Sequence, residues 1–122
     1  MFFTILAIDA MSDSKMYIPP QGIYFRLLGY TSQRVLFSRT HAEPQVFHYP
    51  VGDEYNDQFF TLVPGTGARK GLYLIKSKHT NKVLFSRTHS DPHVGHIDGN
   101  GDFNDKYVIL SLFVLQGLSF RT

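Results

Sequence analysis

The sequence contains the heptapeptide VLFSRTH twice, at residues 35–41 and again at residues 83–89, 48 residues apart. Further matches lie on both sides of the heptapeptide at nearly the same spacing. They pair Glu43-Pro44 with Asp91-Pro92, Asn56-Asp57-Gln58-Phe59 with Asn104-Asp105-Lys106-Tyr107, and Gly22-Ile23-Tyr24 with Gly71-Leu72-Tyr73. Because the matches persist over most of the chain with one small insertion, they indicate duplication of one supersecondary unit.

Within each copy the apolar residues alternate or form short runs, and no sustained helical spacing is present, so the pattern predicts strands. Gly, Pro, Asn and Asp separate the runs and predict turns between them. The expected strands are 22–28, 34–40, 45–51 and 58–63 in the first copy, and 72–77, 82–88, 93–97 and 106–112 in the second. Four short strands per repeat suit a propeller blade or a β-trefoil lobe. A propeller needs at least four blades and a longer chain, which favours an all-β β-trefoil.

The composition indicates one globular domain and excludes several kinds of chemistry. The chain has 122 residues, of which 43% are hydrophobic and 15% aromatic, enough for a packed core. It has no Cys, which excludes disulfides, thiolate catalysis, Cys-type zinc sites and iron–sulfur clusters. A formal charge of +2 without a run of Lys or Arg argues against a nucleic-acid partner.

Two apolar stretches bear on location. Residues 1–11 (MFFTILAIDAM) have no basic leading region and include Asp9, which makes a poor signal peptide. We therefore expect a cytoplasmic protein, with secretion as the alternative. Residues 107–120 are uncharged but shorter than the roughly 18–20 residues that span a bilayer, so we expect buried strands and no membrane insertion.

The run YIPPQGIYFRLLG at residues 17–29, together with both VLFSRTH copies, resembles the β-trefoil lectin module of fungal haemolytic lectins of the Laetiporus sulphureus type. The resemblance extends over about Met16 to Leu110. It implies a ricin B-like β-trefoil fold and binding of galactose-type glycans, such as lactose and N-acetyllactosamine, on glycoproteins. In that family an aerolysin-like pore-forming module follows the lectin module, and we expect none in these 122 residues.

On this basis we divide the chain into three parts. Residues 1–15 are an N-terminal extension, residues 16–111 form a two-lobe β-trefoil lectin domain, and residues 112–122 are an atypical C-terminal segment. Lobe 1 is about 16–66 and lobe 2 about 67–111, called below the first and second copy, with the third lobe missing or degenerate. Open strand edges predict either self-association into a homo-oligomer or terminal segments that fold back over them.

A sugar site needs short polar groups that bond several hydroxyls at once and an aromatic face for the C–H side of the ring. By resemblance, galactose-type pockets lie between the second, third and fourth strands of each copy. The carbohydrate-binding candidates are Arg39, His41, Phe47, His48, Asn56 and Asp57 in the first copy, and Arg87, His89, His96, Asn104 and Asp105 in the second. Phe47 has Gly95 as its counterpart, so the two sites should not be equivalent.

These candidates also have a structural interpretation. Asn-Asp before a strand is a common turn, and an Arg–Asp pair repeated by duplication can join two lobes. For Asp57 and Asp105 the family resemblance favours a sugar-facing role in at least one copy. For Arg39 and Arg87 both roles remain open.

We predict no metal site, no cofactor and no enzymatic activity. The six His do not have helical metal-binding spacing. Residues 98–102 imitate the start of a calcium loop, but Phe103 stands where Gly is needed and Ile109 where Glu is needed. No GxSxG motif is present, and no paired carboxylates lie outside turns. The alternative function is a β-trefoil protein-binding scaffold, such as a protease inhibitor or cytoskeletal linker. Inhibitors use one individual loop, whereas here the loop residues recur.

Overall fold

A computed structural model describes residues 17–100 and 103–110, so the predicted extension at 1–15 and the segment 112–122 lie outside the described residues. Its regular elements are short strands and single 3₁₀ turns. They are β1 (Arg34–Ser38), β2 (Val46–Pro50), η1 (Asn56–Gln58), β3 (Phe60–Pro64), η2 (Gly67–Arg69), β4 (Tyr73–Ser77), β5 (Val83–Ser86), β6 (Val94–Ile97) and η3 (Asn104–Lys106). The described residues thus form an all-β structure, as the apolar alternation predicts. They include no helix of the length and apolarity needed to cross a bilayer.

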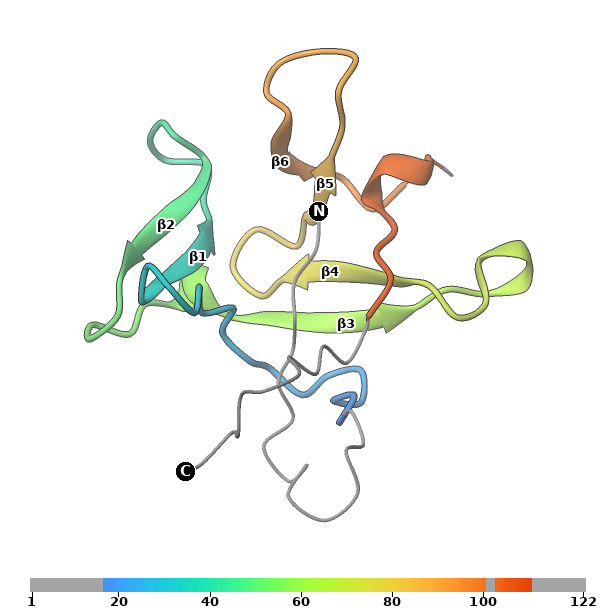
Figure 1. Cartoon of the computed structure of the whole chain (residues 1–122), viewed down its shortest axis with the longest axis horizontal. Helices are drawn as coiled ribbons and strands as arrows, with labels where there is room; N and C mark the ends of the chain where they lie inside the picture. Colours follow the sequence, from blue (N-terminus) through green and yellow to red (C-terminus); the bar gives the residue numbers. More distant parts are fainter. Residues whose placement is uncertain (1–16, 101–102, 111–122) are drawn as a thin grey trace, which may run out of the picture.

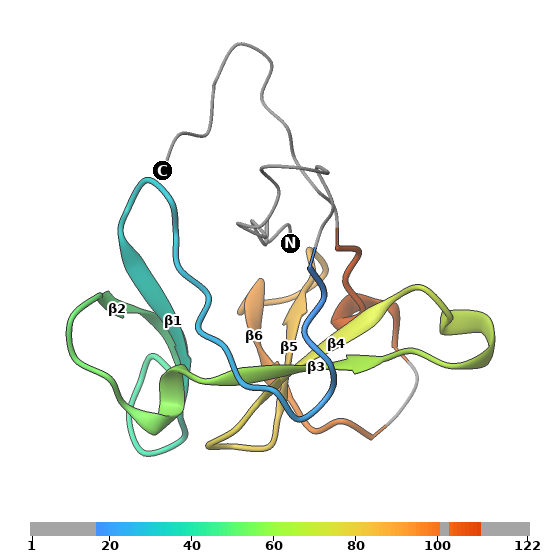
Figure 2. The same ribbon diagram turned by 90° about the horizontal axis from the view of Figure 1, so that it is seen from below.

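The strands form two antiparallel sheets. β1 and β2 make a two-stranded hairpin, and β3, β4, β5 and β6 form a four-stranded sheet in sequence order. The β1–β2 hairpin lies at one end of the long β3–β4 ribbon, and η2 lies at the other end (Figure 1). The view turned by 90° again separates β1–β2 from β5–β6 along this ribbon (Figure 2). Each hairpin therefore presents its own connecting loop.

The second hairpin repeats the first with a shift of 48 residues. Phe37 pairs with Phe47 in β1–β2, and Phe85 pairs with Gly95 in β5–β6. Gln33 (φ 55°) and Asn81 (φ 63°) both adopt the left-handed conformation just before the hairpins. A 3₁₀ turn follows each hairpin, η1 in the first copy and η3 in the second. The duplicated sequence therefore adopts duplicated local geometry.

The first and last predicted strands differ from the structure. Residues 22–28 form only two isolated bridges, Phe25 with Phe60 and Leu28 with Val35, and near the end of the described chain Val108 bridges Tyr73. The strands predicted at 58–63 and 106–112 were also given too early a start, because Gln58 and Lys106 end the 3₁₀ turns Asn56–Gln58 and Asn104–Lys106. Asn and Asp favour turns over strands, and here that local preference prevails.

The core lies where the central sheet meets the chain segments that bridge it. Its buried residues come from the bridging segments and from strands β3, β4 and β5. They are Leu27, Phe60, Leu62, Ile75, Leu84 and Val108. Each such side chain contributes about 1.5–3 kcal/mol through removal of apolar surface from water. Leu36 of β1 and Val46 of β2 pack against this core, and the first-copy candidate residues lie on this hairpin, in its loop and on η1.

Candidate functional site

A cavity of about 270 Å³ lies between the β1–β2 hairpin and η1. Its walls come from β1, the segment after β1, β2, and the turn that begins at Tyr55. The lining residues are Phe37, Arg39, His41, Tyr49, Tyr55, Asp57 and Gln58. The structure thus brings together three residues of the predicted first-copy site, Arg39, His41 and Asp57.

Arg39 connects this cavity to the hairpin loop. Its guanidinium carbon lies 4.4 Å from the centre of the Phe37 ring. Nε donates to the carbonyl of Pro44 at 3.1 Å, and Nη2 donates to the carbonyl of Glu43 at 3.5 Å. Arg39 therefore orders the loop while it lines the cavity, and no ion pair with Asp57 is present within the described residues.

Arg87 makes the same contacts in the second copy. Its guanidinium lies 4.3 Å from the centre of the Phe85 ring. Nε and Nη2 donate to the carbonyls of Pro92 (3.1 Å) and Asp91 (3.3 Å). The duplicated Arg is therefore a loop-ordering residue in both copies, which is a structural role other than the Arg–Asp link considered from the sequence.

Two tyrosines that the sequence analysis did not single out form an aromatic wall. The rings of Tyr49 and Tyr55 meet edge to face, with centres 5.8 Å apart and an interplanar angle of 85°. The carboxylate of Asp53, and then the neighbouring Tyr49, raise the pKa of Tyr55 above its ordinary value. Both residues are exposed, at 39% and 50%, so their ring faces remain accessible to a ligand.

Phe47 and His48 lie elsewhere on the hairpin. The Phe47 ring stacks on His48 with centres 4.2 Å apart, and neither residue lines the cavity. His48 accepts a hydrogen bond on Nδ1 from Nε of Arg34. Tyr49 lies two residues beyond Phe47 and is therefore on the same face of the strand. It supplies the aromatic surface that we expected from Phe47. Asn56, exposed at the start of η1, is also not among the lining residues.

Gln58 is the second feature that sequence reasoning missed. Its side chain is buried, with 1% exposed, and neither Nε2 nor Oε1 has a hydrogen-bond partner within the described structure. Gln58 nevertheless lines the cavity beside Asp57. The repeat carries a signal for this position, because Gln58 is replaced by Lys106 although the preceding Asn-Asp pair is unchanged.

Of the second-copy candidates, Arg87 and His96 line a larger cavity of about 420 Å³ between the two copies. The first copy contributes residues of the β1–β2 loop and β2, and the second contributes β5, β6 and the loop before β6. The lining residues are Glu43, Pro44, Gln45, Val46, Phe85, Arg87, Pro92, Val94, Gly95, His96 and Ile97. His89, Asn104 and Asp105 are not among them.

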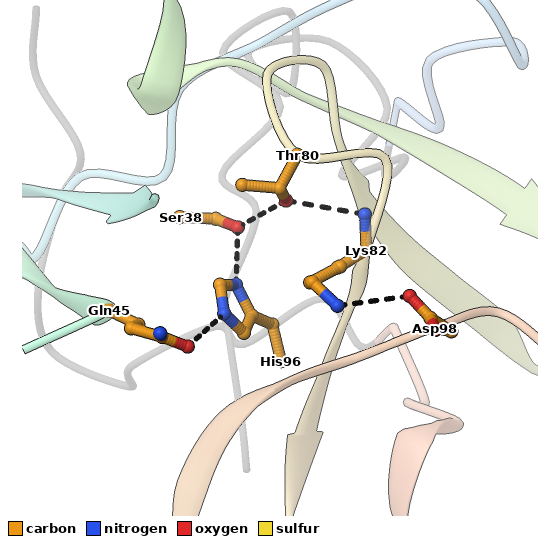
Figure 3. Close-up of polar contacts among 6 residues, drawn as sticks. All are labelled: Ser38, Gln45, Thr80, Lys82, His96 and Asp98. Atoms are coloured by element: carbon orange, nitrogen blue, oxygen red, sulfur yellow. Dashed lines mark hydrogen bonds and ion pairs between the residues drawn. The ribbon is translucent and has the colours of Figure 1, made fainter. Parts of the chain in front are cut away.

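His96 is hydrogen-bonded on both ring nitrogens to the first copy (Figure 3). Nε2 donates to Oε1 of Gln45 at 2.9 Å, so Nδ1 accepts from the hydroxyl of Ser38 at 2.7 Å. The Ser38 hydroxyl, fully buried, also contacts Thr80 Oγ1 at 2.7 Å. Burial first, and then the charge of Lys82, lower the pKa of His96. His96 therefore joins the two copies as a neutral ring at pH 7.

The remaining second-copy candidates lie near η3 or after β5. The side-chain oxygen of Asn104 accepts a hydrogen bond from Arg69, whose guanidinium lies over the Tyr107 ring at 4.6 Å. Asp105 is half-buried in η3, and His89 is exposed. The described part of the chain contains no group of three His, Cys, Asp or Glu that could hold a metal ion.

No family model matches the chain, and no curated protein matches it either. Among solved structures it is similar to one described as "BEL beta-trefoil apo crystal form 3", with 48% identity and a TM-score of 0.70 over 75% of this chain and 62% of that one. It is also similar to the cytolethal distending toxin of Haemophilus ducreyi, with 18% identity and a TM-score of 0.59 over 88% and 64% of the two chains, which bears on the fold alone. The chain spans less than two thirds of either. The predicted all-β β-trefoil fold is confirmed.

Proposed function

We propose that this chain is a carbohydrate-binding lectin module that binds galactose-type glycans, such as lactose and N-acetyllactosamine, in the first-copy cavity. One similarity supports the lectin class, and a second supports the β-trefoil fold on which it rests. The first is the resemblance of residues 16–110 to fungal haemolytic lectins. The second is the 48% identity to the BEL β-trefoil structure.

The observation that carries the proposal is the combination of groups around one cavity. Asp57 offers a carboxylate that can accept from two hydroxyls, and Arg39 and His41 offer N–H donors. Tyr49 and Tyr55 add aromatic surface for the C–H face of a sugar ring. A polyhydroxylated ring with one apolar face is the ligand that matches these groups best.

The size of the cavity bears on affinity. At about 270 Å³ it lies just below the range of roughly 300–1,000 Å³ found for small-molecule pockets, which suits a single sugar ring. One small, open site binds weakly, so we expect millimolar to micromolar dissociation constants, or about −4 to −8 kcal/mol.

Titration calorimetry with lactose tests the proposal. Asp57→Ala should weaken binding by about 1–3 kcal/mol, the range for a lost charged hydrogen bond, with the melting temperature nearly unchanged. Asp105→Ala is the matched variant in the second copy. A fall in melting temperature with unchanged affinity would assign Asp57 a structural role. No heat with any galactoside, together with tight binding of a protein partner, would favour the scaffold class.

The second-copy residues Arg87, His89, His96, Asn104 and Asp105 stay predictions of this proposal, and so does self-association. The engagement of His96 by Ser38 and Gln45 argues for a structural contribution from that residue. The calorimetric stoichiometry of the wild-type protein reports how many sites work.

A further inference from the structure

The buried amide of Gln58 has an unexplained hydrogen-bonding capacity. Roughly nine in ten or more buried polar groups in native structures have a partner, because an unpaired buried group loses its bonds to water. Gln58 is 1% exposed, and within the described residues both its amide nitrogen and its amide oxygen lack a partner. Such an arrangement is unfavourable for folding and calls for a compensating role.

The second copy provides an internal comparison. Lys106 occupies the equivalent position at the end of η3 and is buried to the same 1%. Its ammonium group, however, donates to the carbonyl of Gly99 at 3.1 Å. The fold can therefore provide a hydrogen-bond partner at this position in the second copy, but within the described residues it provides none for the amide of Gln58 in the first.

The differences between the copies concentrate on the first-copy cavity. Tyr49 corresponds to Ile97, because each lies opposite the first Val of the heptapeptide. Tyr55 corresponds to Phe103, because each is the N-cap of its 3₁₀ turn. Gln58 corresponds to Lys106. At all three of these lining positions the second copy therefore lacks the neutral hydrogen-bonding group of the first, although the heptapeptide itself is identical in both copies.

We infer that the side-chain amide of Gln58 is a specificity-determining ligand contact of the first-copy cavity, and that it makes the first copy the stronger glycan site. The inference rests on the proposed function. The amide bonds one sugar hydroxyl, directly or through one bound water. A hydroxyl both donates and accepts, as the amide does. Asp57 and Arg39 carry opposite charges in the same cavity, so a neutral sugar fits it better than an anionic one.

This arrangement predicts how the site discriminates. A site built to bond a hydroxyl rejects the analogue that lacks it, because its polar group is left unpaired again. A series of monodeoxy lactose derivatives should therefore contain one member that binds the wild-type protein poorly. The affinity of that derivative should fall little further when the amide is removed by mutation. The hydroxyl that the derivative lacks is then the one that Gln58 contacts.

The test uses Gln58→Met, which keeps the side-chain length and removes the amide. Calorimetry should show a dissociation constant for lactose about tenfold higher, which corresponds to one lost hydrogen bond of about 1.4 kcal/mol. The melting temperature should stay the same or rise, because the amide that is removed has no partner in the protein. Lys106→Met is the matched control and should leave lactose affinity unchanged.

A second readout is made on the wild-type protein. In ¹⁵N-correlated NMR spectra, the side-chain NH₂ signal of Gln58, identified by its absence in Gln58→Met, should shift on addition of lactose. An unchanged dissociation constant, a stationary NH₂ signal, or a lower melting temperature in Gln58→Met would overturn the inference and leave the proposed function standing. Failure of the wild-type protein to bind any galactoside would overturn both.

Discussion

The contact between the two copies should depend on His96, and the substitution His96→Ala tests this. The ring links Gln45 and Ser38 through hydrogen bonds of 2.9 and 2.7 Å, across 51 and 58 residues of sequence. No other residue of the described chain contacts both of these side chains by a hydrogen bond. Removing the imidazole should therefore weaken the attachment of one hairpin to the other.

The magnitude follows from these contacts. Two net hydrogen bonds at about 0.5–1.5 kcal/mol each give a loss of about 1–3 kcal/mol in the free energy of unfolding. The Ser38 hydroxyl keeps Thr80 as a partner, so no additional penalty for an orphaned buried group is expected. For a domain of about 100 residues, the melting temperature should fall by roughly 10 °C.

Urea unfolding at pH 7.5 measures this change, and His48→Ala is the matched control from the first copy. His48 bonds to Arg34 of its own hairpin, so its loss should matter by about 1 kcal/mol or less. A double-mutant cycle of His96→Ala with Ser38→Ala should give a coupling energy of about 0.5–1.5 kcal/mol. Equal effects of the two His substitutions, or zero coupling, would refute a role for His96 in joining the copies.

Two further predictions concern the same region. Burial and Lys82 lower the pKa of His96, so the unfolded chain takes up the proton first as the pH falls below about 6.5. The stability associated with neutral His96 is therefore present above this pH and lost below it. The urea midpoint should drop more between pH 7.5 and 5.5 in wild type than in His96→Ala. Gly95→Phe, which copies Phe47 into the second hairpin, should lower stability by about 1–3 kcal/mol in the same assay. A Cβ at Gly95 would lie 2.8 Å from the Phe85 ring, and an unchanged midpoint would contradict this reasoning.

The sequence by itself determined the repeat, the strand-rich character and the approximate positions of the strands in each hairpin. These features depend on local information. Alternating apolar residues specify which face of a strand is buried, and a one-residue slip would expose that face. The identical heptapeptides therefore adopt identical register, Phe37 with Phe47 and Phe85 with Gly95. Arg39, His41 and Asp57 were also predictable as site candidates, because the duplication and the family resemblance single them out.

The tertiary structure alone decided which side chains come together and which polar groups have hydrogen-bond partners. Tyr49, Tyr55 and Gln58 form one cavity only because η1 packs against the hairpin, and their spacing in the sequence carries no periodic signal. The sequence likewise treats His96 as a candidate ligand group, whereas its contacts with Ser38 and Gln45 depend on how the two copies meet. Strand alternation reports the burial of a face, which is a local property. Hydrogen-bond satisfaction depends on atoms brought together from distant parts of the chain, so it is settled only when those parts pack.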